Sequence, residues 1–209
     1  MRILIADDHP LLRAGIRQVV EKNFEVDAID EATTSQEVIE KVWHQHYDVV
    51  LLDIIMPGRS GLEVLKQLRQ DRYEAPVLIF SVHPEKQYAI RSLKAGASGY
   101  LTKMRATDEL VDAIRVVIRG ERYITSSLAE VLAAYVESDV KEFPHETLTD
   151  REFEVLCMIA SGNRLKEIAQ KLSLSEKTIS AHRANILKKM NMNSTAELIR
   201  YVIEKELLE

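Results

Sequence analysis

The chain has 209 residues, of which 46% are hydrophobic and 29% are charged, and its formal net charge is −5 at pH 7. This composition is typical of a globular protein with an ample core, and it excludes a whole-chain attraction to nucleic acid or to a membrane. No apolar run approaches transmembrane length, and residues 1–6 indicate a strand rather than a signal peptide. The single cysteine, Cys157, cannot form an internal disulfide, and we expect it in the core of a cytoplasmic protein.

Residues 1–120 alternate short apolar runs with amphipathic segments. The apolar runs predict strands at residues 2–6, 25–30, 48–52, 76–80 and 100–102. The amphipathic segments predict helices that begin at Pro10 and Thr34, the second ending near 46, and helices at 61–70, 85–95 and 107–119. This alternation predicts an α/β doubly wound, flavodoxin-like fold with a five-stranded parallel sheet.

The pattern changes after Gly120. A short amphipathic helix at 127–136 precedes a polar segment, 137–145, that indicates a linker. The remainder predicts a small all-α domain with helices at 149–159, 165–172, 175–190 and 194–207. We expect Gly162 to end the first of these helices and Asn163 to cap the second. The predicted organisation is a first domain at 1–121, a linker with a short helix at 122–144, and a helical domain at 145–209.

Polar side chains follow the predicted strands where each one ends: Asp7, Asp8, Asp53, Ser81 and Lys103. Open parallel sheets bind ligands at the carboxyl ends of their strands. Carboxylates about 4 Å apart repel by about 4 kcal/mol per pair at an effective dielectric of about 20, so the cluster predicts a bound cation. Oxygen ligands favour Mg²⁺. With a lysine and a serine nearby, the arrangement suits an aspartate that attacks phosphorus and becomes an acyl phosphate. A structural ion-pair cluster is the alternative.

At these residues the first domain resembles a response-regulator receiver domain. The resemblance rests on Asp7-Asp8, on Asp53 with Met56-Pro57 and Gly61 behind it, on Ser81 and on Lys103. It implies that a sensor histidine kinase transfers a phosphoryl group to Asp53.

The resemblance also implies roles for individual residues. Mg²⁺ would be held by Asp8, Asp53, the carbonyl of Ile55 and, through water, Asp7. Ser81 and Tyr100 would form a switch pair, in which the hydroxyl moves onto the phosphoryl group and the ring turns inward. Met104 follows Lys103 where many receivers have proline, which leaves the isomer of that peptide bond open.

The second predicted domain contains a helix, a short turn and a basic helix. Residues 177–196 include no acidic residue, and this order of elements predicts a helix-turn-helix whose second helix enters the major groove. We expect DNA contacts from its exposed residues Lys177, Ser180, Ala181, Arg183, Ala184 and Lys188. His182 falls on the apolar face, which indicates a core residue. Residues 148–208 resemble a LuxR-type DNA-binding domain, on Leu148–Glu152 and Lys177–His182.

Together the two resemblances indicate the NarL/FixJ class of transcriptional regulators. They imply a DNA-binding response regulator, not an enzyme, in which phosphorylation promotes homodimerisation and binding to promoter DNA, with RNA polymerase as a further partner and no membrane association. A magnesium-dependent phosphohydrolase remains an alternative, although Asp53 is followed by Ile54-Ile55 and the usual Asp-x-Asp pattern is absent. A third interpretation is a receiver that acts in protein interactions without phosphorylation.

Overall fold

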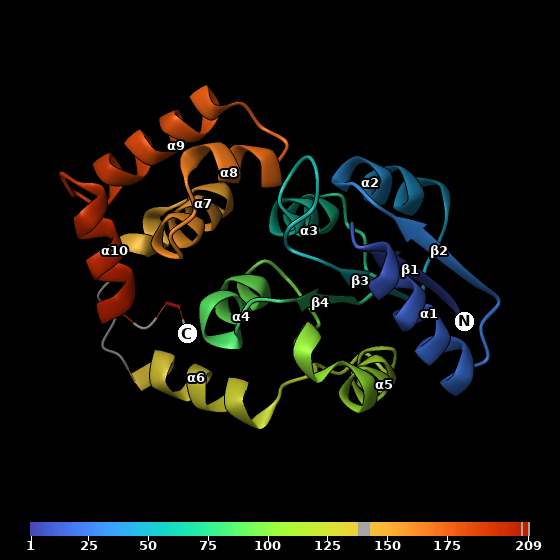
Figure 1. Cartoon of the computed structure of the whole chain (residues 1–209). Helices are drawn as coiled ribbons and strands as arrows, with labels where there is room; N and C mark the ends of the chain where they lie inside the picture. Colours follow the sequence, from blue (N-terminus) through green and yellow to red (C-terminus); the bar gives the residue numbers. More distant parts are fainter. Residues whose placement is uncertain (138–142, 206, 209) are drawn as a thin grey trace. The chain divides into compact units, whose positions relative to one another are not determined.

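The structure is a computed structural model that describes residues 1–137, 143–205 and 207–208, and within them the side chains of 105–108 and 137 are outside the description. The chain forms two compact units, Met1–Leu132 and Ala133–Glu209 (Figure 1). Helix α6 (Ser126–Glu137) spans the division. Part of the predicted linker, residues 138–142, lies outside the described residues.

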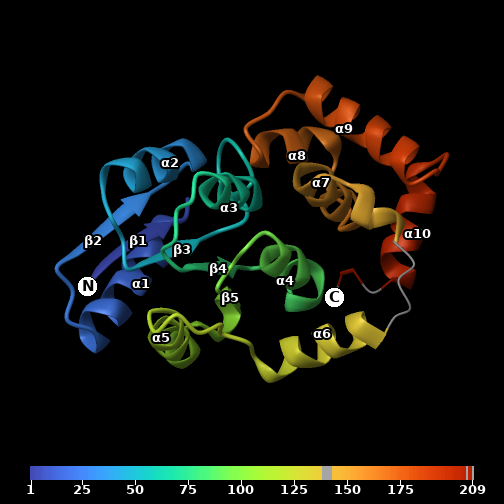
Figure 2. The same ribbon diagram turned by 180° about the vertical axis from the view of Figure 1, so that it is seen from behind.

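The first unit is built on a parallel sheet with the strand order β2-β1-β3-β4-β5 (Figures 1 and 2). The strands are β1 (Arg2–Ala6), β2 (Ala28–Ala32), β3 (Val49–Leu52), β4 (Val77–Ser81) and β5 (Gly99–Thr102). The direction of winding reverses between β1 and β3, which places a switch point of the sheet at their carboxyl ends. The predicted doubly wound α/β fold is confirmed.

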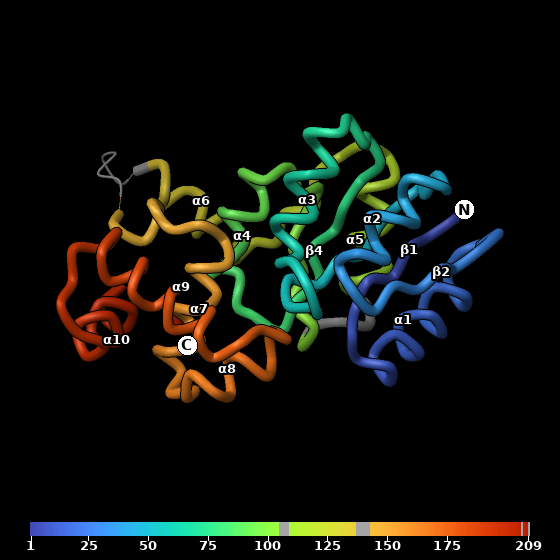
Figure 3. Tube along the Cα trace, turned by 90° about the horizontal axis from the view of Figure 1, so that it is seen from above, coloured from blue at the N-terminus to red at the C-terminus, as the bar shows by residue number. Residues whose placement is uncertain are grey.

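The edge strand β2 (Figure 3) begins later than the sequence predicted. The backbone nitrogen of Asp27 donates to the carbonyl of Met1 over 2.8 Å, and ladder pairing starts only at Arg2 with Ala28. The register with β1 therefore decides where the strand begins. Most of β2 is half-buried, and an edge strand of this kind carries a weak hydrophobic period in its sequence.

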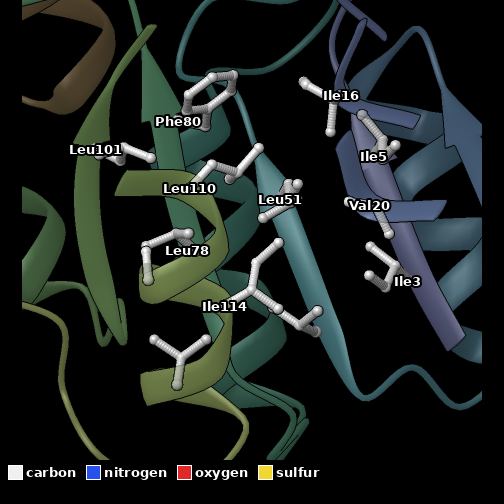
Figure 4. Packing of buried hydrophobic residues seen from close by; sticks show 13 residues of the cluster. Ile3, Ile5, Ile16, Val20, Leu51, Leu78, Phe80, Leu101, Leu110 and Ile114 are labelled. Atoms are coloured by element: carbon white, nitrogen blue, oxygen red, sulfur yellow. The ribbon is translucent and has the colours of Figure 1, made fainter. Parts of the chain in front are cut away.

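Alternate residues of the strands fill the core beneath α1 (Pro10–Asn23) and α5 (Ala106–Val117). This follows from the side-chain period of two in a strand. Figure 4 shows the strand residues meeting the two helices. The cluster includes Ile3, Ile5, Val49, Leu51, Leu78, Phe80 and Leu101 from the strands, and Ile16, Val20, Leu110 and Ile114 from the helices. Each such side chain contributes about 1.5–3 kcal/mol when fully buried, so the strands that carry the site are firmly held.

Helices α2 (Ser35–His44), α3 (Gly61–Gln70) and α4 (Glu85–Lys94) lie on the other face of the sheet (Figures 1 and 2). Thr34 caps α2 by accepting from the Glu37 backbone nitrogen over 3.2 Å, as its sequence predicts. A short 3₁₀ turn, η1 (Lys103–Arg105), links β5 to α5. Most helix ends of this unit therefore agree closely with the sequence patterns.

The second unit contains η2 (Pro144–Thr147), α7 (Asp150–Ala160), α8 (Leu165–Lys171), α9 (Glu176–Lys189) and α10 (Thr195–Glu204) (Figure 1). Thr149 and Glu152 form the predicted capping box of α7. The prediction for α8 was wrong in one detail, because Arg164 occupies its N-cap position. The Asn163 amide donates instead to the carbonyl of Met158 over 3.0 Å, which ties it to the end of α7. Cys157 is buried and forms no disulfide, as expected.

Candidate functional site

The register of β1 and β3 brings two aspartates together at the carboxyl ends of these strands. Ala6 pairs with Leu52, and the backbone nitrogen of Asp53 donates to the Ala6 carbonyl over 2.9 Å. Asp7 and Asp53 are the next residues of the two strands, so their side chains emerge side by side. Both residues are buried, at 1% and 4% exposure.

Lys103 joins these two carboxylates. Its Nζ lies 2.5 Å from Asp7 Oδ2 and 2.6 Å from Asp53 Oδ2, and the three side chains are at most 5% exposed. The ammonium offsets the mutual repulsion of the carboxylates, which is about 4 kcal/mol for a pair about 4 Å apart at an effective dielectric of about 20. One positive charge between two negative charges leaves the buried group anionic, and it therefore attracts a cation.

Burial changes the pKa of the Asp53 carboxyl group. It raises the pKa of this carboxyl group to about 6, against the opposing effect of Lys103, and the charge of Asp7 adds to the increase. Asp53 Oδ1 accepts a hydrogen bond from the backbone nitrogen of Ile54 over 2.7 Å. At neutral pH the group is ionised, which is the form that can attack an electrophilic phosphorus atom.

Asp8 and His9 extend the cluster toward solvent. His9 Nδ1 lies 2.8 Å from Asp8 Oδ1 and 3.1 Å from Asp7 Oδ1, and the Asp8 side chain is 34% exposed. Potential ligand atoms of Asp7, Asp8, His9 and Asp53 all lie within 4.8 Å of one another. Asp8 Oδ1 is itself buried, and its only polar partner among the described residues is the His9 ring, so the carboxylate can still coordinate a cation.

The predicted switch residues lie at the ends of β4 and β5. Ser81 and Tyr100 are fully buried, and the Tyr100 hydroxyl donates to the carbonyl of His83 over 2.8 Å. Burial raises the pKa of Tyr100, so the phenol stays protonated and remains a donor. Burial, assisted by the charge of Lys103, lowers the pKa of His83 to about 4, so its ring is neutral at pH 7.

The loop after β3 packs tightly against the strand end. A Cβ on Gly61 would lie 2.0 Å from the carbonyl oxygen of Asp53, which explains the glycine at this position. Three residues that follow site residues within two positions of the chain are apolar and at least partly exposed, and we call them the apolar rim: Ile55 is half-buried, Val82 is 57% exposed and Met104 is 89% exposed. The described residues contain no cis peptide bond, so the bond between Lys103 and Met104 is trans.

Sequence reasoning missed Arg13 and its partner Glu31, which together hold the backbone beside the acidic pair. The guanidinium of Arg13 donates to the backbone carbonyl of Asp7 over 2.8 Å and to Glu31 Oε2 over 2.8 Å. The only signal in the sequence is a pair of arginines, Arg13 and Arg17, spaced by one helical turn, together with an acid near the end of a strand. Nothing in that pattern indicates a contact with the Asp7 carbonyl.

In the second unit, the turn between α8 and α9 contains Ser173 in the left-handed region, at φ 53°, and Ser175 caps α9 by accepting from the Thr178 nitrogen over 3.0 Å. The predicted stripe on α9 is exposed along its length, at Lys177, Ser180, Ala181, Ala184 and Lys188. Its shape and charge suit a helix that lies in a DNA groove. His182 is half-buried rather than part of the core.

Two basic residues of α9 are engaged within the helical unit. Arg183 Nε donates to the Thr195 hydroxyl over 2.9 Å, and Arg183 is half-buried. Lys189 Nζ lies 2.6 Å from Glu152 Oε2, the same oxygen that accepts from the Thr149 nitrogen in the capping box of α7. Arg183 is therefore bonded within the helical unit and is less exposed than the other residues predicted to contact DNA.

None of the helices within the described residues has both the length and the hydropathy needed to cross a membrane.

Comparison with known families matches both units. The family described as "Response regulator receiver domain" matches residues 3–115, and the family described as "Bacterial regulatory proteins, luxR family" matches residues 146–202. Response regulator UvrY of Escherichia coli strain K12 is 34% identical over 204 residues, covering 97% of this chain and 94% of UvrY. Oxygen regulatory protein NreC of Staphylococcus carnosus is 34% identical over 216 residues, covering 100% of both chains.

Solved structures give the same result. The RcsB response regulator of Salmonella typhimurium has a TM-score of 0.63 and 25% identity, covering 97% of this chain and 98% of RcsB. A structure of two RcsB dimers bound to two parallel DNAs has a TM-score of 0.60 and 25% identity, covering 97% of each chain. The chain therefore belongs to the NarL/FixJ class of two-component response regulators, transcription regulators rather than enzymes, and it joins a receiver domain to a LuxR-type DNA-binding domain.

Proposed function

We propose that a sensor histidine kinase phosphorylates Asp53 in a reaction that requires Mg²⁺, and that the phosphorylated protein dimerises and binds promoter DNA. The observation that carries this proposal is the buried Asp53 carboxylate, 2.6 Å from Lys103 and beside Asp7 at the switch point of the sheet. A structural ion pair alone does not need a third carboxylate, Asp8, at the solvent side of the cluster.

In the proposed reaction an Asp53 oxygen attacks the phosphorus of a phosphohistidine or of a small acyl phosphate. A P–O bond to Asp53 forms while the bond from phosphorus to the donor breaks, and the donor leaves with the electron pair. Lys103 supports this transfer because its ammonium already faces Asp53 Oδ2 and can follow the negative charge onto a phosphoryl oxygen.

The donor set suits a hard divalent cation. Asp8, Asp53 and the Ile55 carbonyl would hold Mg²⁺ directly, with Asp7 contributing through water, and oxygen ligands with an open side are what Mg²⁺ prefers. The ion would supply positive charge that neutralises the phosphoryl oxygens. The potential ligand atoms of Asp7, Asp8 and Asp53, which lie within 4.8 Å of one another, support this assignment.

Ser81 and Tyr100 are the proposed switch. The Ser81 hydroxyl ends β4 beside the acceptor strand, within reach of a shift toward a phosphoryl oxygen, and it accepts from the His83 nitrogen over 3.4 Å. Tyr100 is already inward and holds the His83 carbonyl. A movement of Ser81 would thus alter the loop between β4 and α4, which both hydroxyl groups contact.

The second unit supplies the output. We propose that the exposed stripe of α9 lies in the major groove, that two copies of the chain read paired half-sites, and that the bound dimer acts on RNA polymerase in the cytoplasm, where promoter DNA is found. The domain limits that we propose are 1–121 for the receiver, 122–144 for the linker and 145–209 for the DNA-binding domain.

Treatment with acetyl phosphate, with and without EDTA, tests the proposal when the modified residue is located by mass spectrometry. We expect a single phosphorylated residue, Asp53, only in the presence of Mg²⁺, and a gain in affinity for paired half-sites over a single half-site. Asp53→Ala is the control for the acceptor. Equal labelling of this variant, or labelling that survives EDTA, would overturn the proposed acceptor or the proposed metal requirement.

A further inference from the structure

Arg13 connects the loop that carries the acidic pair to the neighbouring strand β2. Its Nη1 donates to the backbone carbonyl of Asp7 over 2.8 Å, and its Nε donates to Glu31 Oε2 over 2.8 Å. The side chain is only 12% exposed. A planar guanidinium can satisfy two acceptors in fixed directions at once, which an ammonium cannot do as well.

The Asp7 carbonyl belongs to the peptide group that joins Asp7 to Asp8. The backbone nitrogen of Asp7 is already held by the Ala32 carbonyl over 3.0 Å, so Arg13 fixes the other side of the same residue. Beyond that peptide the chain leaves the sheet, and Asp8 has no strand partner to orient it. The orientation of the Asp7–Asp8 peptide group therefore determines where the Asp8 carboxylate points.

We propose that Arg13 is a positioning residue for the Mg²⁺ site, and that it acts by fixing the Asp7–Asp8 peptide group. This assignment rests on the proposed function. Two adjacent carboxylates repel each other, so the conformation that directs both of them to one cation needs support from the backbone. Second-shell partners of this kind change metal affinity by about 10–100-fold when they are removed.

Arg17 provides a matched comparison. It also binds the Glu31 carboxylate, at 2.6 Å and 3.0 Å, but its other hydrogen bond goes to the carbonyl of Ile29 over 3.1 Å. Arg13 and Arg17 thus share a helix, a charge and an anionic partner. They differ in which backbone carbonyl they hold, and Arg17 is also more exposed, with its Nη1 lying 3.7 Å from Glu21 Oε1.

Charge alone predicts the opposite result. A guanidinium near a cation site repels the cation, so replacing Arg13 or Arg17 with a neutral residue would tighten Mg²⁺ binding if only Coulomb forces acted. The positioning role predicts weaker binding for the Arg13 variant. The sign of the change in affinity therefore separates the two explanations.

The experiment compares the full chain with Arg13→Gln, Arg13→Lys and Arg17→Gln. The affinity of the unphosphorylated protein for Mg²⁺ is measured by competition with Mn²⁺, whose free concentration is followed by electron paramagnetic resonance. We expect Arg13→Gln to weaken Mg²⁺ binding about tenfold, which corresponds to about 1.4 kcal/mol. Arg13→Lys should fall between this variant and wild type, and Arg17→Gln should match wild type or bind slightly more tightly.

A second readout excludes a general loss of structure. The initial rate of Asp53 phosphorylation by acetyl phosphate should be reduced in Arg13→Gln at low Mg²⁺ and should recover at saturating Mg²⁺, whereas a destabilised fold would not recover. Equal Mg²⁺ affinities for Arg13→Gln and Arg17→Gln would overturn the positioning role while leaving the proposed function intact. Failure of the wild-type chain to bind Mg²⁺ would overturn the proposed function, and the role of Arg13 with it.

Discussion

The carboxylate of Glu85 accepts a hydrogen bond from the hydroxyl of Ser127 over 2.6 Å, which ties the first residue of α4 to the first turn of α6. The Thr125 hydroxyl donates to the other carboxylate oxygen over 2.8 Å and accepts from the Leu128 nitrogen over 3.0 Å. Glu85 lies shortly after the His83 carbonyl that Tyr100 holds. A change at Ser81 and Tyr100 therefore has a short, bonded route to the start of the helix that leaves the receiver.

Ser127→Ala should loosen the start of α6. Hydrogen bonds to charged groups contribute about 1.5–3 kcal/mol, so we expect amide hydrogen exchange in the first turn of α6 to be about 10- to 100-fold faster. We also expect a smaller gain in DNA affinity on phosphorylation. The matched control is Ser126→Ala, which changes the exposed neighbouring serine. If both variants exchange at the same rate as wild type, or if both lose the same fraction of the response, Glu85 does not couple the receiver to α6.

Asp53→Asn should make the metal-free protein more stable at neutral pH. The pKa of Asp53 is raised by burial from its ordinary value of 3.8 to about 6. The folded protein thus binds more protons than the unfolded chain between these values, and stability falls as the pH rises through this window. The whole difference corresponds to about 3 kcal/mol at about 1.4 kcal/mol for each pH unit, and we expect a gain of about 1–3 kcal/mol at pH 7.

Urea unfolding in EDTA, at pH 7 and at pH 4, measures this effect. The gain should largely disappear at pH 4, where the native carboxyl group is protonated and resembles the amide. Asp71→Asn, at an exposed position that ends α3, serves as the control and should change little at either pH. A gain of equal size at both pH values would show that ionisation of Asp53 is not its cause.

The phosphorylated protein should lose its phosphoryl group slowly. Hydrolysis needs a water molecule aligned opposite the aspartyl oxygen, and the side chains at the rim, Ile55 and Val82, cannot hydrogen-bond one. His83, which follows Val82, could orient a water, but it is half-buried and its ring contacts Tyr88 at a centroid distance of 5.0 Å. Ile55→Asn supplies a polar group at the rim and should shorten the lifetime severalfold, whereas Ile55→Leu should not.

Decay of the phosphorylated band on a phosphate-affinity gel gives these lifetimes directly. A wild-type half-life of a few seconds would contradict the apolar-rim explanation, as would equal rates for the asparagine and leucine variants.

The sequence predicted the parts of the receiver that depend on local pattern. β1, β3 and β4 are buried on both faces and read as continuous apolar runs, and the polar residues at their ends identified the acidic cluster. β2 was misplaced because its start is set by pairing of Ala28 with Arg2, a relationship between distant segments. A strand on the sheet edge has one neighbour and a weaker pattern, so local reasoning had little to use.

The residues that sequence reasoning missed act through contacts between separate elements. Arg13 reaches the Asp7 carbonyl, and Glu85 reaches Ser127 across 42 positions of the sequence. Each looks like an ordinary charged residue of a helix. Arg183 shows the converse case, because its charge predicted DNA contact while its Nε is bonded to Thr195. Charge patterns show which residues can bind an anion, but only the packing shows which are already engaged.

The exposed lysines of α9 should govern affinity for DNA more than sequence preference. Ser180, Ala181 and Ala184 occupy the middle of the exposed stripe, and serine and alanine cannot make the bidentate base contacts worth about 1–3 kcal/mol each. Lys177 and Lys188 flank them and suit phosphate contacts, which carry little sequence information. A single domain should therefore bind weakly and with low selectivity, and specificity should arise from paired half-sites about 10 base pairs apart.

Binding of wild type, Lys188→Ala and Arg183→Ala to single and paired half-sites across a salt series tests this assignment. We expect Lys188→Ala to lower the salt slope by about 1 per recognition helix and to weaken all sequences alike. Arg183→Ala should leave the slope unchanged and lower the melting temperature instead, because it removes the bond to Thr195. A reduced slope in Arg183→Ala would place that guanidinium on the DNA. Loss of preference at one base pair in Lys188→Ala, with non-specific binding unchanged, would mean that Lys188 reads a base edge directly and that the phosphate assignment is wrong.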